Sequence, residues 1–226
     1  MKFQLALDAV ELQQAKAIVG KIHRELDIVE MGTPFLWRYP LDVIREFKNE
    51  FPDVEILADL KIMDGGAYCA NMAFDAGADI VTVSALSLDE NIKGAVAAAR
   101  EKNRKVLADL MAVPVDEIAK TALRVEQIGV DYVCIHRGIG IKTSPLAGLK
   151  ILKETLTTAG AAIAGGIDAV TLGEIAPYNP DLVIMGSVLT GAPNPLAVLT
   201  ELKEIGRSKE HKKQERTEET HGTECR

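Results

Sequence analysis

Residues 58–66, Ala-Asp-Leu-Lys-Ile-Met-Asp-Gly-Gly, decide the fold. They continue an apolar run that is typical of a buried strand. Residues two apart on a strand face the same side, so Asp59 and Lys61 are predicted to project together. Asp64 follows just beyond the strand, where Gly65-Gly66 permits a sharp exit of the chain. Because buried charges are costly unless paired, the cluster is either a structural ion pair or a polar site for an anionic or hydroxylated ligand.

The rest of the chain alternates short apolar strands with amphipathic helices. The predicted strands are residues 3–7, 27–31, 54–62, 80–83, 106–110, 132–135, 161–164 and 182–185. The predicted helices are residues 11–23, 41–47, 67–76, 89–100, 115–128, 146–156 and 169–176, and a last helix that begins at Asn194-Pro195. This alternation indicates a parallel sheet with right-handed crossovers. Eight units favour an α/β fold closed into a (β/α)₈ TIM barrel, with an open doubly wound sheet as the alternative.

Composition narrows the class of protein further. The chain has 226 residues, of which 47% are hydrophobic and 4% aromatic, as expected for helices around one parallel-stranded core. A net charge of −7 argues against nucleic acid or an anionic membrane as a partner. No apolar run approaches the length of a membrane span, and the three cysteines have no framework or metal-ligand spacing, so we expect a cytoplasmic protein.

The composition divides the chain into two parts. Residues 1–206 are expected to form the barrel as the catalytic domain. Residues 207–226 are rich in Lys, Glu, Arg, Thr and His with almost no apolar residue, so they cannot bury enough surface to offset the entropy of ordering. We predict a solvated, charged C-terminal tail that is disordered or extends the last helix.

Charged residues gather at the predicted strand ends. Active sites of such barrels form at the carboxyl ends of the strands. In chain order, the ionisable residues there are Asp8, Glu30, Asp59, Lys61, Asp64, Asp109, His136 and Arg137. Their convergence on one cleft favours a functional site over a structural ion pair. Carboxylates such as Glu30 and Asp59 suit Mg²⁺, and His136 suits acid–base work near neutral pH.

The last two strands end in small residues instead of charges. Gly165-Gly166 follows the seventh predicted strand, and Gly186-Ser187 follows the eighth. Glycines let backbone N–H groups approach a phosphate closely, and these two loops are the usual phosphate site of barrels. Gly165-Gly166 alone could be only a tight turn, but together the two loops favour a phosphate site.

Several segments resemble 3-hexulose-6-phosphate synthase. They are residues 4–8, 29–34, 58–66, 76–79, 92–96 and 162–167. The spacing Asp59-x-Lys61-x-x-Asp64 is similar to the hallmark motif of the orotidine-5′-monophosphate decarboxylase suprafamily, which also contains 3-keto-L-gulonate-6-phosphate decarboxylase. The resemblance extends over essentially everything before the tail.

This resemblance implies a reaction and an assembly. The reaction is the aldol condensation of formaldehyde with D-ribulose 5-phosphate, a phosphorylated sugar, through an enediolate stabilised by Mg²⁺ at Glu30 and Asp59. The assembly is a homodimer with active sites at the interface, where Asp64 reaches into the partner's site. The expected catalytic residues are Lys61, Asp64, Asp109 and His136, with His136 as the base. The expected substrate-binding residues are Asp8, Arg137, Gly165, Gly166, Gly186 and Ser187.

Local details distinguish the branches of this suprafamily. Asp109 and Ala164-Gly165-Gly166 resemble the synthase pattern, because the decarboxylase branch has Glu and Thr-Gly-Gly at these positions. The sixth-strand loop, residues 136–140, differs from both patterns. The alternatives are therefore 3-keto-L-gulonate-6-phosphate decarboxylase and a barrel that binds a phosphosugar without turnover.

Overall fold

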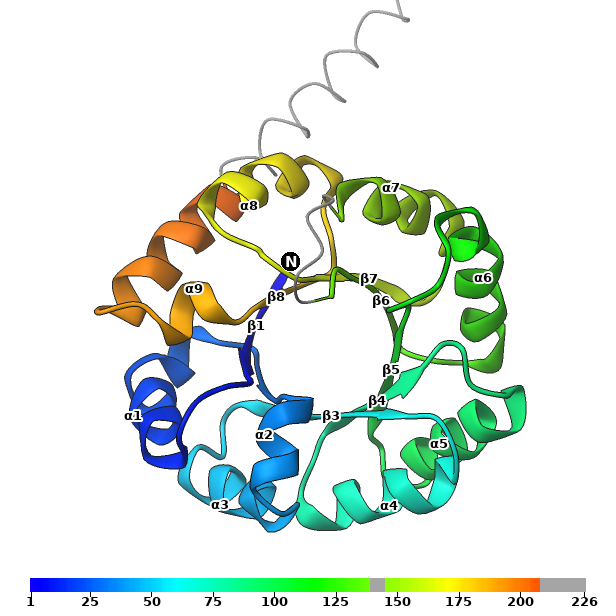
Figure 1. The fold of residues 1–226 in the computed structure, drawn as a ribbon, viewed down its shortest axis with the longest axis horizontal. Coiled ribbons are helices and arrows are strands. Elements are labelled where there is room, and N and C mark those ends of the chain that lie inside the picture. The colour runs from blue at the N-terminus through cyan, green and yellow to red at the C-terminus, as the bar shows by residue number, and fades with distance from the viewer. Residues whose placement is uncertain (139–144, 208–226) are drawn as a thin grey trace, which may run out of the picture.

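The computed structural model describes residues 1–138 and 145–207, and these residues form a closed barrel of parallel strands. Each strand pairs with its neighbours in chain order, and β8 pairs with β1 (Figure 1). The strands are β1 (Lys2–Leu7), β2 (Ile28–Met31), β3 (Glu55–Ile62), β4 (Ile80–Ser84), β5 (Lys105–Asp109), β6 (Tyr132–His136), β7 (Gly160–Ala164) and β8 (Leu182–Met185). The predicted TIM barrel is thus confirmed, and the open sheet is excluded.

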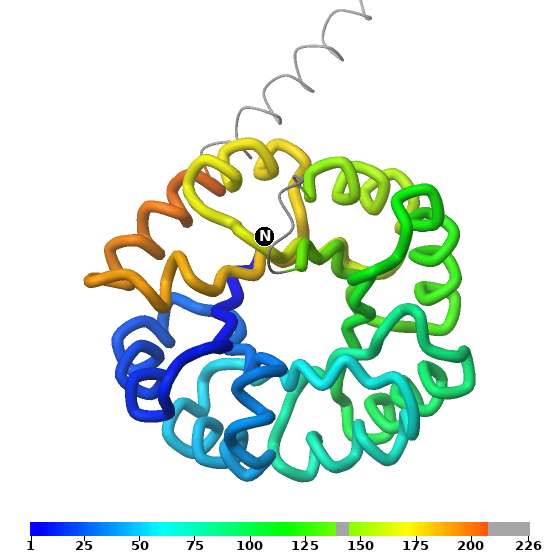
Figure 2. The backbone as a smooth tube through the Cα atoms, viewed as in Figure 1, coloured from blue at the N-terminus to red at the C-terminus, as the bar shows by residue number. Residues whose placement is uncertain are grey.

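The helices form a ring outside the strands (Figures 1 and 2). The α-helices are α1 (Leu12–Ile22), α2 (Thr33–Arg38), α3 (Asp42–Glu50), α4 (Gly66–Ala76), α5 (Asp89–Glu101), α6 (Ile118–Ile128), α7 (Leu146–Thr155), α8 (Ala169–Ile175) and α9 (Ser187–Thr190), followed by a helix over 195–207. Short 3₁₀ turns are η1 (His23–Glu25), η2 (Val115–Glu117) and η3 (Ala176–Tyr178). No helix within the described ranges has the length and apolar character needed to cross a bilayer.

The apolar side chains form two separate cores. The larger outer core lies between strands and helices, where α1, for example, buries Ala15, Ile18, Val19 and Ile22. A smaller inner core fills the barrel itself with the following side chains: Ala6, Ile28, Leu57, Ile80, Leu107, Cys134, Ala162, Ala164, Leu182 and Ile184. Both faces of the strands are therefore buried, which explains their continuous apolar sequences.

Three local features differ from the sequence prediction. Helix α2 occupies a segment predicted as irregular, because Pro34 lies in its first turn, where proline is tolerated. Helix α9 was also not predicted, and the predicted helix 115–128 begins as the 3₁₀ turn η2. Asn194 caps the last helix as predicted, since its Oδ1 accepts a hydrogen bond from the Ala197 N–H at 3.3 Å. Of the predicted tail, residues 208–226 lie outside the described residues.

Strand β3 is irregular near its carboxyl end. Its pairing with β4 shifts register between Ala58 and Ile62. Lys61 has φ of 45°, in the left-handed region that non-glycine residues seldom adopt. The Lys61 N–H donates to Thr82 Oγ1 of β4 at 2.8 Å instead of to a backbone carbonyl. Such strained positions cluster at functional sites, and this one aims the Lys61 side chain at the barrel mouth.

Candidate active site

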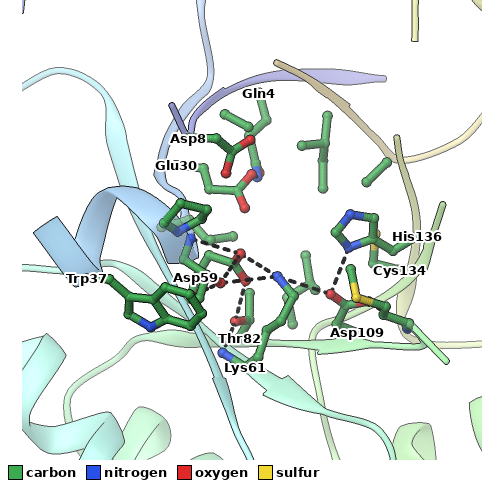
Figure 3. A pocket seen from close by; sticks show the side chains of 18 residues that line it. Gln4, Asp8, Glu30, Trp37, Asp59, Lys61, Thr82, Asp109, Cys134 and His136 are labelled. Atoms are coloured by element: carbon green, nitrogen blue, oxygen red, sulfur yellow. Dashed lines mark hydrogen bonds and ion pairs between the residues drawn. The ribbon is translucent and has the colours of Figure 1, made fainter. Parts of the chain in front are cut away.

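A cavity of about 340 Å³ opens at the carboxyl ends of the strands (Figure 3). Its upper wall is polar, and its floor is the top of the inner apolar core. The lining side chains come from all eight strands, from the loops after β1 and β5, and from α2: Gln4, Ala6, Asp8, Glu30, Thr33, Pro34, Trp37, Leu57, Asp59, Lys61, Thr82, Leu107, Asp109, Met111, Cys134, His136, Ala164 and Ile184. Apolar walls with a few convergent polar groups are typical of small-molecule sites.

Lys61 lies between two buried carboxylates at the centre of the cavity. Its ammonium forms an ion pair with Asp59 and lies 3.5 Å from Asp109 Oδ2 (Figure 3). Both carboxylates are 4% exposed. Burial by itself would lower the pKa of Lys61, but Asp59 and Asp109 raise it above its ordinary value. Lys61 therefore remains a cation at neutral pH, as a group that stabilises negative charge must.

Two threonine hydroxyls hold Asp59. Thr33 Oγ1 donates to Asp59 Oδ2 at 2.8 Å, and Thr82 Oγ1 donates to Asp59 Oδ1 at 2.8 Å. Neither threonine was singled out from the sequence. Two sequence signals were available: Thr82 is the only hydroxyl residue in the apolar strand 80–83, and Thr33 directly follows the glycine after β2. The two bonds fix the carboxylate plane and leave its charge directed at Lys61.

His136 and Asp109 form a hydrogen-bonded pair on the side of the cavity opposite Asp59. His136 Nδ1 lies 2.9 Å from Asp109 Oδ2, and the Met111 N–H donates to Asp109 Oδ1 at 2.8 Å. Burial alone would raise the pKa of Asp109, but His136, Lys61 and the Met111 N–H lower it below its ordinary value. An ionised carboxylate only accepts hydrogen bonds, so Nδ1 carries the proton. In the neutral ring, Nε2 is then the free acceptor of a proton.

Glu30, Asp8 and Gln4 gather across the cavity from His136 (Figure 3). Gln4 Nε2 donates to Glu30 Oε2 at 2.6 Å. Burial, and then repulsion by Asp59, raise the pKa of Glu30 well above its ordinary value. The same two causes raise the pKa of Asp8. Carboxylates this close together repel each other when ionised, and a cation bound between them would relieve the repulsion.

The donor set is compatible with Mg²⁺, although it does not form a closed cage. Within residues 1–138 and 145–207, no group of three or more His, Cys, Asp or Glu side chains has the arrangement of a metal site. Mg²⁺ keeps several waters and often uses one or two carboxylates together with substrate oxygens. Glu30 and Asp59 provide such a pair in one cavity, and Gln4 Oε1 beside them is buried without a hydrogen-bond partner.

A second cavity of about 490 Å³ adjoins the first. The two share Ala6, Asp8 and Ile184 as a common wall. Its other side chains and backbone come from the loop after β1, from the last three strand ends and from α9: Ala9, Arg137, Gly138, Gly165, Gly166, Ile167, Gly186, Ser187 and Thr190. Every residue predicted to bind phosphate lines this cavity. Gly165 and Gly166 have φ of 97° and 67°, so this turn favours glycine at both positions.

The structure brings together all the predicted site residues of this chain except one. Asp64 is exposed and lines neither cavity, and its Oδ1 accepts a hydrogen bond from the Gly65 N–H at 2.7 Å. The resemblance placed Asp64 in the site of a partner subunit, and a position outside its own cavity is compatible with that expectation. The chemical roles of all these residues remain predictions.

The sequence and the barrel fold place the chain in a known class of lyase. Residues 1–202 match the Orotidine 5'-phosphate decarboxylase / HUMPS family, and the chain belongs to that family.

Within this family, the chain is similar to 3-hexulose-6-phosphate synthases. The synthase of Bacillus subtilis (strain 168) is 38% identical over 208 residues, which are 91% of this chain and 98% of that protein. The crystal structure of the Salmonella typhimurium synthase is 34% identical, with a TM-score of 0.87, and the match covers 92% of this chain and 100% of that one. A 3-keto-L-gulonate-6-phosphate decarboxylase from Vibrio cholerae is 25% identical, with a TM-score of 0.80 over 92% of this chain and 97% of that one. The protein is thus an enzyme, a carbon–carbon lyase like the synthases.

Proposed function

We propose that the protein condenses formaldehyde with D-ribulose 5-phosphate to give 3-hexulose 6-phosphate, and catalyses the reverse cleavage. The observation that carries the proposal is the row Asp59–Lys61–Asp109–His136 in one cavity. Greater identity to synthases than to the decarboxylase supports the choice of reaction.

His136 is suited to begin the condensation. Adding one carbon beside the ketone requires that C1 of ribulose 5-phosphate lose a proton, which leaves an enediolate. The Asp109 hydrogen bond keeps the proton on Nδ1 of His136, so Nε2 can take the C1 proton. The enediolate carbon then attacks formaldehyde, and the proton goes to the former aldehyde oxygen. Atoms and charge balance over the two steps.

The negative charge of the enediolate needs stabilisation. Lys61 supplies a fixed cation, and its two carboxylate neighbours hold it in place. We propose that Glu30 and Asp59 hold Mg²⁺. When bound, this ion would stabilise charge on two neighbouring substrate oxygens. Asp8, on the wall common to both cavities, can accept a hydrogen bond from a sugar hydroxyl.

The substrate spans both cavities in this proposal. The reacting carbons lie near His136 and Lys61, and the phosphate lies against Gly165-Gly166 and Gly186-Ser187. Because the two cavities share a wall, a phosphorylated ketose can occupy both at once. This arrangement explains why one cavity is lined by charged side chains and the other by backbone-exposing glycines.

We further propose that the active form is a homodimer. Large apolar side chains are exposed around the barrel mouth: Trp37, Met63, Tyr68, Leu88 and Val115. Trp37 lines the catalytic cavity although it is 83% exposed. Exposed apolar patches of this kind mark protein interfaces, and a second copy would cover them and deliver its Asp64. Light scattering that gave the mass of a single chain would contradict the dimer.

The compartment that we propose is the cytoplasm. The described cysteines, Cys69 and Cys134, are free thiols, as expected in a reducing environment. Cell fractionation that recovered the protein outside the cytoplasm would refute this assignment.

The reaction is tested by following formaldehyde consumption with ribulose 5-phosphate and Mg²⁺. We expect His136→Ala to lower kcat about 10²- to 10⁴-fold, as for other lost general bases. Chelation of Mg²⁺ should remove activity and its return should restore it. Lys120→Gln, on the exposed surface of α6, is the matched control and should leave activity unchanged. Release of CO₂ from 3-keto-L-gulonate 6-phosphate, without formaldehyde consumption, would favour the decarboxylase instead.

A further inference from the structure

We infer that Arg137 binds the substrate phosphate and makes the enzyme specific for phosphorylated ketoses. The inference rests on the proposed function and extends it, because it adds a side-chain cation from β6 to a phosphate site otherwise made of glycine backbone and Ser187.

The guanidinium lies directly against the glycine turn after β7. A Cβ atom built on Gly166 would stand 2.6 Å from Arg137 Cζ and closer still to one of its terminal nitrogens. A Cβ atom on Gly165 would stand 2.8 Å from Arg137 Cβ. Any larger residue at either position would therefore displace the arginine. The two glycines make room for this side chain as well as forming the turn.

Among the described residues, no carboxylate forms an ion pair with Arg137, whereas most of the other described arginines have such a partner. Five arginines of the described chain form ion pairs with Asp or Glu: Arg38, Arg45, Arg100, Arg104 and Arg124. Among residues 1–138 and 145–207, none forms an ion pair with Arg137, although it is half-buried and lines the second cavity. Asp8 shares this cavity but is not in ion-pair contact. A half-buried cation without a counter-ion is costly, which points to an anionic ligand.

The chemistry of the cavity identifies that anion as a phosphate monoester. A guanidinium presents a planar fork of N–H donors that matches two phosphate oxygens. The adjacent glycine turn has positive φ at two successive residues and lines the same cavity, so a ligand there can approach its backbone. The cavity adjoins the catalytic one through Ala6, Asp8 and Ile184. An anion at Arg137 is therefore within reach of a sugar whose reacting carbon faces His136.

Calorimetry with ribulose 5-phosphate and with inorganic phosphate tests the inference. We expect Arg137→Gln to weaken both affinities about 10- to 100-fold, the value of a lost charge-assisted hydrogen bond. Arg137→Lys keeps the charge and should recover part of the loss. In turnover assays, KM for ribulose 5-phosphate should rise by a similar factor while kcat stays within about 3-fold, since this contact is the same in ground and transition states. Arg45→Gln, an exposed arginine of α3, is the matched control.

The outcomes separate this inference from the proposed reaction. Equal affinities in the wild type and Arg137→Gln would overturn the role of Arg137 and leave the aldolase proposal intact. A lower kcat with unchanged KM would also overturn it, because the residue would then act on the reacting carbons. A wild type that binds ribulose 5-phosphate through Arg137 but consumes no formaldehyde would refute the reaction and support the phosphate role.

Discussion

Thr82 offers a sharp test of how the site is built. Its hydroxyl donates to Asp59 Oδ1 and accepts the Lys61 N–H, both at 2.8 Å, and the side chain is buried. Thr82→Val preserves the shape of the side chain and removes only these two bonds. The variant therefore tests how far the Thr82 hydroxyl of β4 holds Asp59 and Lys61 of β3 in place.

The two lost bonds set the expected magnitude. A hydrogen bond to a charged group contributes about 1.5–3 kcal/mol, and one between neutral groups contributes about 0.5–1.5 kcal/mol. We therefore expect Thr82→Val to lower the free energy of unfolding by about 2–4 kcal/mol. With an m-value of about 2 kcal/mol per molar urea, the unfolding midpoint should fall by about 1–2 M. Lys61 would also lose the contact that holds it in the left-handed region, so its ammonium should move and kcat/KM should fall at least about 10-fold.

Urea unfolding monitored by circular dichroism, together with steady-state kinetics, provides the measurement. Thr82→Ser is the control, because it keeps the hydroxyl and loses one methyl group, at a cost of about 1 kcal/mol. It should retain most of the activity. If Thr82→Val is within about 0.5 kcal/mol of the wild type and equally active, the hydroxyl does not organise Asp59 and Lys61, and the reasoning is wrong.

Two further predictions concern acid stability and the interface. Glu126 Oε1 accepts hydrogen bonds from the backbone N–H groups of residues 157–159. Burial alone would raise the pKa of Glu126, but these hydrogen bonds lower it below its ordinary value of 4.5. Since the folded-state pKa is depressed, this stability is present above pH 4.5 and is lost as pH falls through the folded pKa. Glu126→Ala should lower the free energy of unfolding by about 3 kcal/mol at pH 7, and in urea titrations its difference from the wild type should shrink only as the pH falls below 4.5. Asp64→Ala and His136→Ala should each be inactive alone, and refolding an equal mixture should restore about a quarter of wild-type activity if Asp64 serves the partner's site. A mixture as inactive as its components would show that the sites are not shared in this way.

The regular part of the fold could be predicted because it depends on local patterns. Each strand is a short apolar run, and each long helix carries an apolar stripe, so alternation alone indicated the barrel. Helix α2 is only six residues long and was not predicted, because so short a segment has no clear periodicity. The strand ends were also predictable, since parallel strands bring their carboxyl ends to one face.

The supporting contacts could not be predicted, because they join distant segments. Thr33 reaches Asp59 from the start of α2 and Thr82 reaches it from β4, and nothing local in the sequence assigns them to it. The sequence suggested that Asp59 and Lys61 project together from a regular strand, whereas their pairing depends on the irregularity of β3. The orientation of Arg137 likewise depends on the backbone of Gly166, almost thirty positions later.

The separation of the two apolar cores has a consequence for how such an enzyme can change during evolution. The apolar floor of the catalytic cavity belongs to the inner core, through Ala6, Leu57, Leu107, Ala164 and Ile184. The helices are held by a different set of side chains on the opposite faces of the same strands. Substitutions in the inner core that make room for a longer or bulkier aldehyde therefore leave the packing between strands and helices unchanged. Divergence towards new substrates can accumulate in one layer while the other preserves the scaffold.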